Sequence, residues 1–335
     1  MKRTTRALLA AVLTVALAGA LQTPAGAAAP EELRLRDLDR GESARVPYLE
    51  GDVLVDGGRR IELPGNVGGL LGTSGDDYLV WVFTQGDAKD RVVRISSDGS
   101  REPILRARAL YDAGLSPDGT SLATSVSGRS RRTTFKTYDT TTGALTSRRT
   151  LTGYGNVLDF DGDRVAIGVD SPNKTVVWSP ATDRIRKVVG KTGFRADLES
   201  DRLAVFSKDP YSGGCTVVST FSEPETELWR SCRERVEAWS ADGSRMATVD
   251  LLADGLGPGR AWLRRSTGGL LGAYDAPYYF GRITFEDANR VLMDTYSDTL
   301  YAVVRCNRGG CERASRLYGH SAPASPMRVP FAGPR

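Results

Sequence analysis

The chain contains few side chains of the kinds that enzymes use as nucleophiles or general bases. Its single histidine, His320, lies in a Pro- and Ser-rich tail, and the sequence has no Gly-x-Ser-x-Gly motif. A Ser-His-Asp hydrolase would need that histidine as its base. The four cysteines are even in number, so pairing them would leave no free thiol. We therefore predict no catalytic residue and no cofactor, and favour a binding protein over an enzyme.

The alternative function, that of an enzyme or a metal-binding protein, would depend on carboxylates. The alternating aspartates of Asp159–Asp163 resemble the start of an EF-hand loop. Counted from Asp159, however, the sixth residue is Arg164 rather than Gly, and the twelfth is Asp170 rather than Glu. We interpret this segment as a hairpin turn and predict no metal site. A hydrolase or lyase with a central-channel site, calcium-dependent in one version, would instead use acidic residues close to the first strand of a repeat: Asp112, Asp197 and Glu237.

The N-terminus has the pattern of a secretory signal peptide. Lys2, Arg3 and Arg6 precede an apolar run from Leu8 to Leu21, and small residues follow as far as Ala28. We expect residues 1–28 to be removed and the protein to be secreted or associated with the cell envelope. No later stretch is apolar enough to predict a transmembrane segment.

The charge balance argues against a nucleic-acid partner. Taking the three basic leader residues from the total of 45 leaves 42 Lys and Arg against 41 Asp and Glu. A nearly neutral chain lacks the positive field that attracts phosphate backbones. Residues 29–44 are rich in charges, so we predict a charged N-terminal linker there, followed by one domain over residues 45–331.

A repeat of about 43 residues organises the rest of the chain. In each copy a turn of Ser, Asp or Gly is followed directly by a short apolar strand. The markers of the copies are separated by 44, 43, 38, 43 and 45 residues, which fits a β-propeller blade of about 40–45 residues. The markers are Gly75, Gly119, Gly162, Ser200, Gly243 and Ala288.

Each repeat has room for four strands joined by hairpin turns. In one unit we place them at 113–116, 122–126, 135–139 and 145–149, from alternating apolar residues and Gly-, Asp- and Ser-containing turns. Six units are complete, and residues 45–63 supply three strands of another. The sequence thus predicts an all-β propeller of seven four-stranded blades, with 327–331 as the missing strand. Six blades remain an alternative.

The hairpins also predict the disulfides. Cys215 and Cys232 lie at the two ends of one predicted strand pair, and Cys306 and Cys311 lie across the base of another. Three pairings of four cysteines exist, and the spacing favours Cys215–Cys232 with Cys306–Cys311.

Two of the turns carry a recognisable motif. Residues Leu115–Ala123 (LSPDGTSLA) and Trp239–Ala247 (WSADGSRMA) resemble the WD40-like propeller repeats of TolB and its relatives. The other copies have lost the Pro or the Gly, and the Gly-His and Trp-Asp signatures of eukaryotic WD40 repeats are absent. The resemblance implies a propeller and, by analogy with TolB, a protein-binding role without a named partner.

The variable loops are the predicted binding face. The connections between the second and third strands, and between one unit and the next, differ in length, and they leave a propeller on the same face. We expect a monomer that binds a protein, peptide or cell-envelope ligand there. Tyr and Arg are typical of binding hot spots, which gives the candidates Tyr111, Arg131, Tyr154, Phe194, Arg195, Tyr211, Tyr278, Tyr279 and Arg282.

Overall fold

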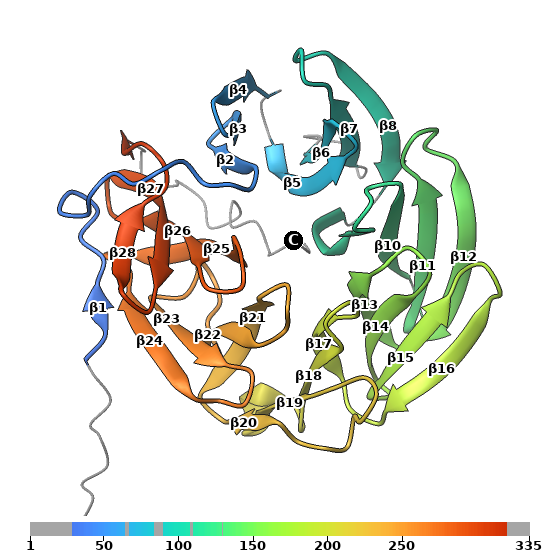
Figure 1. Cartoon of the computed structure of the whole chain (residues 1–335). Coiled ribbons are helices and arrows are strands. Elements are labelled where there is room, and N and C mark those ends of the chain that lie inside the picture. Colours follow the sequence, from blue (N-terminus) through green and yellow to red (C-terminus); the bar gives the residue numbers. More distant parts are fainter. Residues whose placement is uncertain (1–28, 64–66, 84–89, 108–109, 129, 320–335) are drawn as a thin grey trace, which may run out of the picture.

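Seven β-sheets, antiparallel within each blade, form a ring around a central axis (Figure 1). The computed structural model describes residues 29–63, 67–83, 90–107, 110–128 and 130–319. The predicted leader 1–28, His320 and the predicted closing strand 327–331 lie outside these residues. The predicted all-β, seven-bladed propeller is confirmed. Two three-residue 3-10 helices, η1 (Leu110–Asp112) and η2 (Pro210–Ser212), are the helices of the described part, and neither could cross a membrane.

Within a blade the strands run in sequence order from A at the channel to D at the rim. The bounds of the first four blades are as follows. Blade 1 has three strands, β2 (Tyr48–Glu50), β3 (Val53–Asp56) and β4 (Arg59–Glu62); blade 2 has β5 (Val67–Ser74), β6 (Asp77–Val82), β7 (Asp90–Ile95) and β8 (Arg101–Ala107); blade 3 has β9 (Gly114–Leu115), β10 (Ser121–Gly128), β11 (Arg132–Asp139) and β12 (Leu145–Thr152); blade 4 has β13 (Tyr154–Phe160), β14 (Val165–Asp170), β15 (Lys174–Ser179) and β16 (Arg184–Val189).

The last three blades follow the same order, with additions at the rim. Blade 5 has β17 (Gly193–Asp197), β18 (Arg202–Phe206), β19 (Thr216–Ser219) and β20 (Trp229–Ser231); blade 6 has β21 (Glu234–Trp239), β22 (Arg245–Asp250), β23 (Arg260–Arg265) and β24 (Leu270–Asp275), with β1 (Glu31–Glu32) parallel to β24; blade 7 has β25 (Tyr279–Phe285), β26 (Val291–Tyr296), β27 (Leu300–Asn307) and β28 (Gly310–Arg313), with β29 (Tyr318–Gly319) also on β27.

The motif turns join strands A and B through side-chain hydrogen bonds. The Ser116 hydroxyl donates to the Asp118 carboxylate at 2.6 Å, and the Thr120 amide donates to the same carboxylate at 3.0 Å. The second copy repeats the first bond from Ser240 to Asp242, again at 2.6 Å. Each turn therefore fixes its own geometry, as the repeat of Ser, Asp and Gly in the sequence predicts.

The ring is held together by apolar clusters between neighbouring blades. Seven buried clusters occur in the described part, and each contains residues of two adjacent blades. Tyr48 and Val55 of blade 1, for example, pack against Leu292, Tyr301 and Val303 of blade 7. Burial of these faces is the main stabilising term. It also closes the ring, since the first and last blades meet through side chains.

Both predicted disulfides are confirmed. Cys215 directly precedes β19 and Cys232 directly follows β20, and their Cα atoms are 4.0 Å apart. Cys306 and Cys311 are register partners in β27 and β28, with Cα atoms 4.2 Å apart. Cross-links of hairpin ends limit the freedom of the unfolded chain, and a loop of about 15 residues gives roughly 3 kcal/mol.

Residues 31–44, which we call the N-terminal strap, lie along the rim of blades 6 and 7 (Figure 1). The sequence suggested a charged linker here, but Leu33 and Leu35 are 0% and 2% exposed and join the core between these blades. Further along, Gly41 donates its amide hydrogen to the carbonyl of Arg313 at 3.0 Å. The alternating leucines explain the docking, because they give one apolar face to an otherwise charged segment.

Candidate functional site

Exposed apolar side chains gather on the face that carries the B–C and D–A loops. Tyr211 of η2 is 71% exposed, and Tyr154 at the start of β13 is 50% exposed. Five of the seven large apolar side chains that are exposed in the described part belong to these loops or the adjoining strand ends: Phe83, Tyr154, Tyr211, Leu252 and Tyr278. The other two, Leu145 and Leu270, begin strands D and so lie at the opposite face.

The predicted binding residues divide into exposed and packed ones. Arg131, Tyr154, Tyr211 and Tyr278 are exposed, on blades 3, 4, 5 and 7. Tyr111 belongs to η1, but its side chain is outside the described part. These exposed residues come from separate blades around one face, as a protein-binding loop surface requires.

The packed candidates have partners inside the protein. Phe194 stacks on Phe206 with ring centroids 4.0 Å apart, and Tyr279, which is 6% exposed, stacks on Tyr296 at 4.5 Å. These aromatic residues therefore contribute to blade packing rather than to an exposed binding surface.

The three carboxylates of the catalytic alternative have separate partners. The Asp197 carboxylate accepts a hydrogen bond from the Ser200 amide at 3.0 Å, and Glu237 forms an ion pair with Arg195 at 2.9 Å. Asp112 accepts a hydrogen bond from the Ser125 hydroxyl. Among the residues with described positions, no group of three His, Cys, Asp or Glu is close enough to hold a metal ion.

The Asp159–Asp163 segment is an A–B turn. Asp159 accepts a hydrogen bond from the Leu198 amide at 2.6 Å, which ties blade 4 to blade 5. Asp161 accepts from the amides of Asp163 and Arg164 at 3.1 and 2.6 Å. The carboxylates of Asp159 and Asp161 thus accept hydrogen bonds from backbone amides, in agreement with the hairpin-turn interpretation.

Asp112 gives a pH-dependent stability. Burial raises its pKa from 3.8 to about 6. The folded chain therefore holds the proton more tightly than the unfolded chain, so the stabilisation from the protonated carboxyl is complete below about pH 4 and is lost as pH rises through 6. Two pKa units correspond to about 3 kcal/mol. As the pH rises from 4.5 to 7.5, we expect the free energy of unfolding of Asp112→Asn to increase relative to that of the natural chain, by at most about 3 kcal/mol.

The measurement is the urea midpoint of both chains at the two pH values. Asp294, whose pKa burial also raises to about 6, titrates in both proteins, so its contribution cancels in the comparison. Parallel pH profiles for variant and natural chain would contradict the assignment to Asp112.

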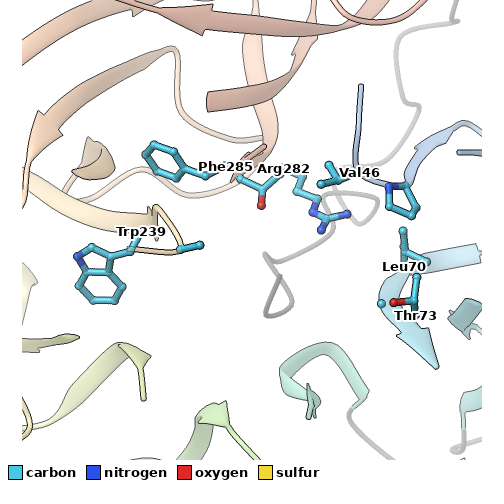
Figure 2. Close-up of a pocket in the computed structure, with 10 residues that line it drawn as sticks. Val46, Leu70, Thr73, Trp239, Arg282 and Phe285 are labelled. Carbon is cyan, nitrogen blue, oxygen red and sulfur yellow. The ribbon is translucent and has the colours of Figure 1, made fainter. Parts of the chain in front are cut away.

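A hollow of about 260 Å³ lies in the central channel, at the end of several A strands (Figure 2). Val46 and Leu70 line one side, and Trp239 and Phe285 line the other. Arg282 is the one charged residue among the lining residues of the described part, and its guanidinium lies between the two sides. Of these lining residues, the sequence analysis identified only Arg282. The others come from blades 1, 2, 6 and 7, which meet only when the ring closes, so no local pattern in the sequence connects them.

β-Bulges place the channel side chains on strand A. In blade 5, Phe194 and Arg195 oppose the single residue Ala204. In blade 7, Gly281 and Arg282 oppose Asp294. Both arginines thus belong to a bulge of strand A, although the bulge of blade 7 lies further from the A–B turn than that of blade 5. A bulge redirects a side chain out of the regular alternation, and bulges are frequent next to functional sites.

Comparison with known proteins supports the fold and no narrower relationship. No protein-family model matches the chain, and no curated protein matches it significantly. Among solved structures, the propeller domain of the trilobed protease from Pyrococcus furiosus has a TM-score of 0.59 at 11% identity over 81% of this chain and 94% of that chain. The Swd1 β-propeller domain of Myceliophteria thermophila has 0.50 at 8% identity over 85% and 89%.

An oligogalacturonate lyase solved in complex with manganese also resembles the chain, with a TM-score of 0.52 at 12% identity over 72% of this chain and 78% of that chain. At such identities the similarity shows the fold alone. The WD40-like propeller expected from the two motif copies is therefore confirmed as an architecture, and the neighbours include both enzymes and domains described only as propellers.

Proposed function

We propose that the protein is an exported, non-enzymatic β-propeller that binds a protein, peptide or cell-envelope ligand on its B–C and D–A loop face. The observation that carries this proposal is the distribution of exposed apolar side chains, which favours that face by five to two in the described part. Exposed aromatic residues on a rigid scaffold are typical of recognition surfaces.

The compartment is consistent with the proposal. Two disulfides and no free cysteine are compatible with an extracellular or envelope location, where thiols are oxidised. The N-terminal signal pattern points the same way.

The test compares the two faces of the ring. A loop-face variant, Tyr154→Ser with Tyr211→Ser, is matched by a control on the opposite face, Leu145→Ser with Leu270→Ser. Each pair replaces two exposed apolar side chains, so both variants should keep their melting temperatures, since surface substitutions change stability by about 0.5 kcal/mol or less. Purified proteins are immobilised and exposed to an envelope and culture-fluid extract from the source cells, and the bound proteins are quantified by mass spectrometry.

We expect one protein of the extract to be bound in equal amount by the natural chain and by the control variant, and in at least tenfold smaller amount by the loop-face variant. Its direct titration with the purified chain should give the same ranking. Equal loss from both variants, or loss only from the control, would overturn the loop-face assignment.

A further inference from the structure

The two arginines at strand-A bulges, Arg195 in blade 5 and Arg282 in blade 7, have different partners. The Arg195 guanidinium is 2.9 Å from the Glu237 carboxylate of the next blade. The Arg282 guanidinium makes no hydrogen bond or ion pair with any residue that the structure describes, although it lies inside the channel where burial lowers its pKa. The Arg282 side chain is half-buried, so solvent can still reach it. A cation that is partly withdrawn from water without a contacting anion is expected where a ligand supplies the anion.

Blade 7 also differs from its neighbours behind this arginine. The residue opposite its bulge is Asp294, the fifth residue counted from the arginine at the start of strand B, where blades 4, 5 and 6 have Gly168, Phe206 and Val249. A charged residue at a position that is uncharged in these three blades breaks the pattern. Such local departures from a consistent design are expected at functional sites.

Asp294 supports Arg282 without occupying its donors. Its carboxylate accepts a hydrogen bond from the Tyr301 hydroxyl at 3.3 Å and another from the Arg282 backbone amide. It attracts the Arg282 side chain electrostatically, but the two charged groups do not come within the 4 Å of an ion pair. The guanidinium lies between the two sides of the hollow (Figure 2).

We propose that this hollow binds a small organic acid, with its carboxylate on Arg282 and its apolar body against the side lined by Val46 and Leu70 (Figure 2). One guanidinium matches one planar carboxylate by two parallel hydrogen bonds. The volume of about 260 Å³ is below the range of about 300–1,000 Å³ for drug-sized ligands. The nearby negative charge of Asp294 favours a monoanion over a phosphate dianion.

The experiment uses 3-phenylpropionate as a probe acid and 3-phenylpropionamide as its neutral match. Binding of each to the purified natural chain is titrated by calorimetry and by ligand-observed NMR. We expect the acid to bind at least tenfold more tightly than the amide, because only the acid gains charge-assisted hydrogen bonds. This comparison needs no variant, so it remains valid even if a channel substitution impairs folding.

Two variants assign the site. Arg282→Gln should bring the affinity for the acid down to that for the amide, whereas Arg195→Gln, at the strand-A bulge of blade 5 and outside the lining of the hollow, should leave the preference for the acid unchanged. Equal affinity of the natural chain for acid and amide, absence of saturable binding, or an undiminished preference in Arg282→Gln would each overturn the proposal. None of these results bears on the loop-face variants, which lie at the other end of the strands.

Discussion

Gly119→Ala should lower the free energy of unfolding by about 3–4 kcal/mol, and the melting temperature by roughly 6–10 °C. Gly119 lies in the motif turn of blade 3 with φ of +69°, in the left-handed region that costs other residues about 1–2 kcal/mol. A Cβ atom there would also be 2.0 Å from the carbonyl oxygen of Thr73 in blade 2. Backbone cannot withdraw as a side chain can, so the two blades would have to separate.

Gly75→Ala is the matched control. Gly75 occupies the corresponding turn of blade 2 with φ of +60°, but among the described residues no atom beyond its two chain neighbours lies within 4 Å of its added Cβ. It therefore pays only the conformational term of about 1 kcal/mol. Urea denaturation of the two variants separates the contribution of the turn from that of the contact between blades. Equal losses would mean that the close approach of Gly119 to Thr73 does not restrain the ring.

Sequence patterns predicted the blades because each blade repeats local chemistry. The Ser116–Asp118 hydrogen bond and its counterpart at Ser240 lie within single turns, so spacing alone identifies them. The disulfides followed for the same reason, since Cys306 and Cys311 pair across one hairpin. Local signals of this kind are independent of how the ring closes.

Contacts between distant blades were harder to predict. The channel hollow joins Leu70 to Trp239 and Phe285, which are far apart in sequence and read as ordinary core residues. Asp294 was overlooked, although aligning the second strands shows an aspartate where blades 4, 5 and 6 have Gly168, Phe206 and Val249. In the strap, net charge masked the alternation of Leu33 and Leu35, which pack into the core between blades 6 and 7.

Arg305 connects the strap to a buried carboxylate of blade 7. Its side chain is 3% exposed and hydrogen bonds to the Glu286 carboxylate at 2.6 and 2.7 Å. It also donates to the Glu312 carboxylate at 2.7 Å and to the backbone carbonyls of Glu42 and Ser43, both at 3.1 Å. Burial would raise the pKa of Glu286, but the hydrogen bonds from Arg305 and from the Arg45 amide hold it below its usual value. One guanidinium thus connects blade 7 to the N-terminal strap.

Arg305→Met should cost about 3–5 kcal/mol, because it leaves the Glu286 carboxylate, whose side chain is 1% exposed, without its main counter-charge. Arg305→Lys should lose less, since it keeps the charge but not the planar set of donors. The control is Arg149→Met, which breaks a pair with Asp183 whose side chains are 37% and 55% exposed, and should cost less than about 1 kcal/mol.

Urea denaturation gives the energies, and trypsin digestion reports on the strap. If Arg305 holds the strap on the rim, cleavage after Arg36 and Arg40 should become faster in Arg305→Met under native conditions and remain slow in Arg149→Met. Equal stability losses in the two variants, with unchanged cleavage of the strap, would show that the apolar contacts of Leu33 and Leu35 hold it without Arg305. The expected result would instead show that docking of the strap depends on the buried ion pairs of Arg305. The strap crosses blades 6 and 7 before the chain enters blade 1. It therefore adds backbone contacts beside the junction of blades 1 and 7, where the ring closes.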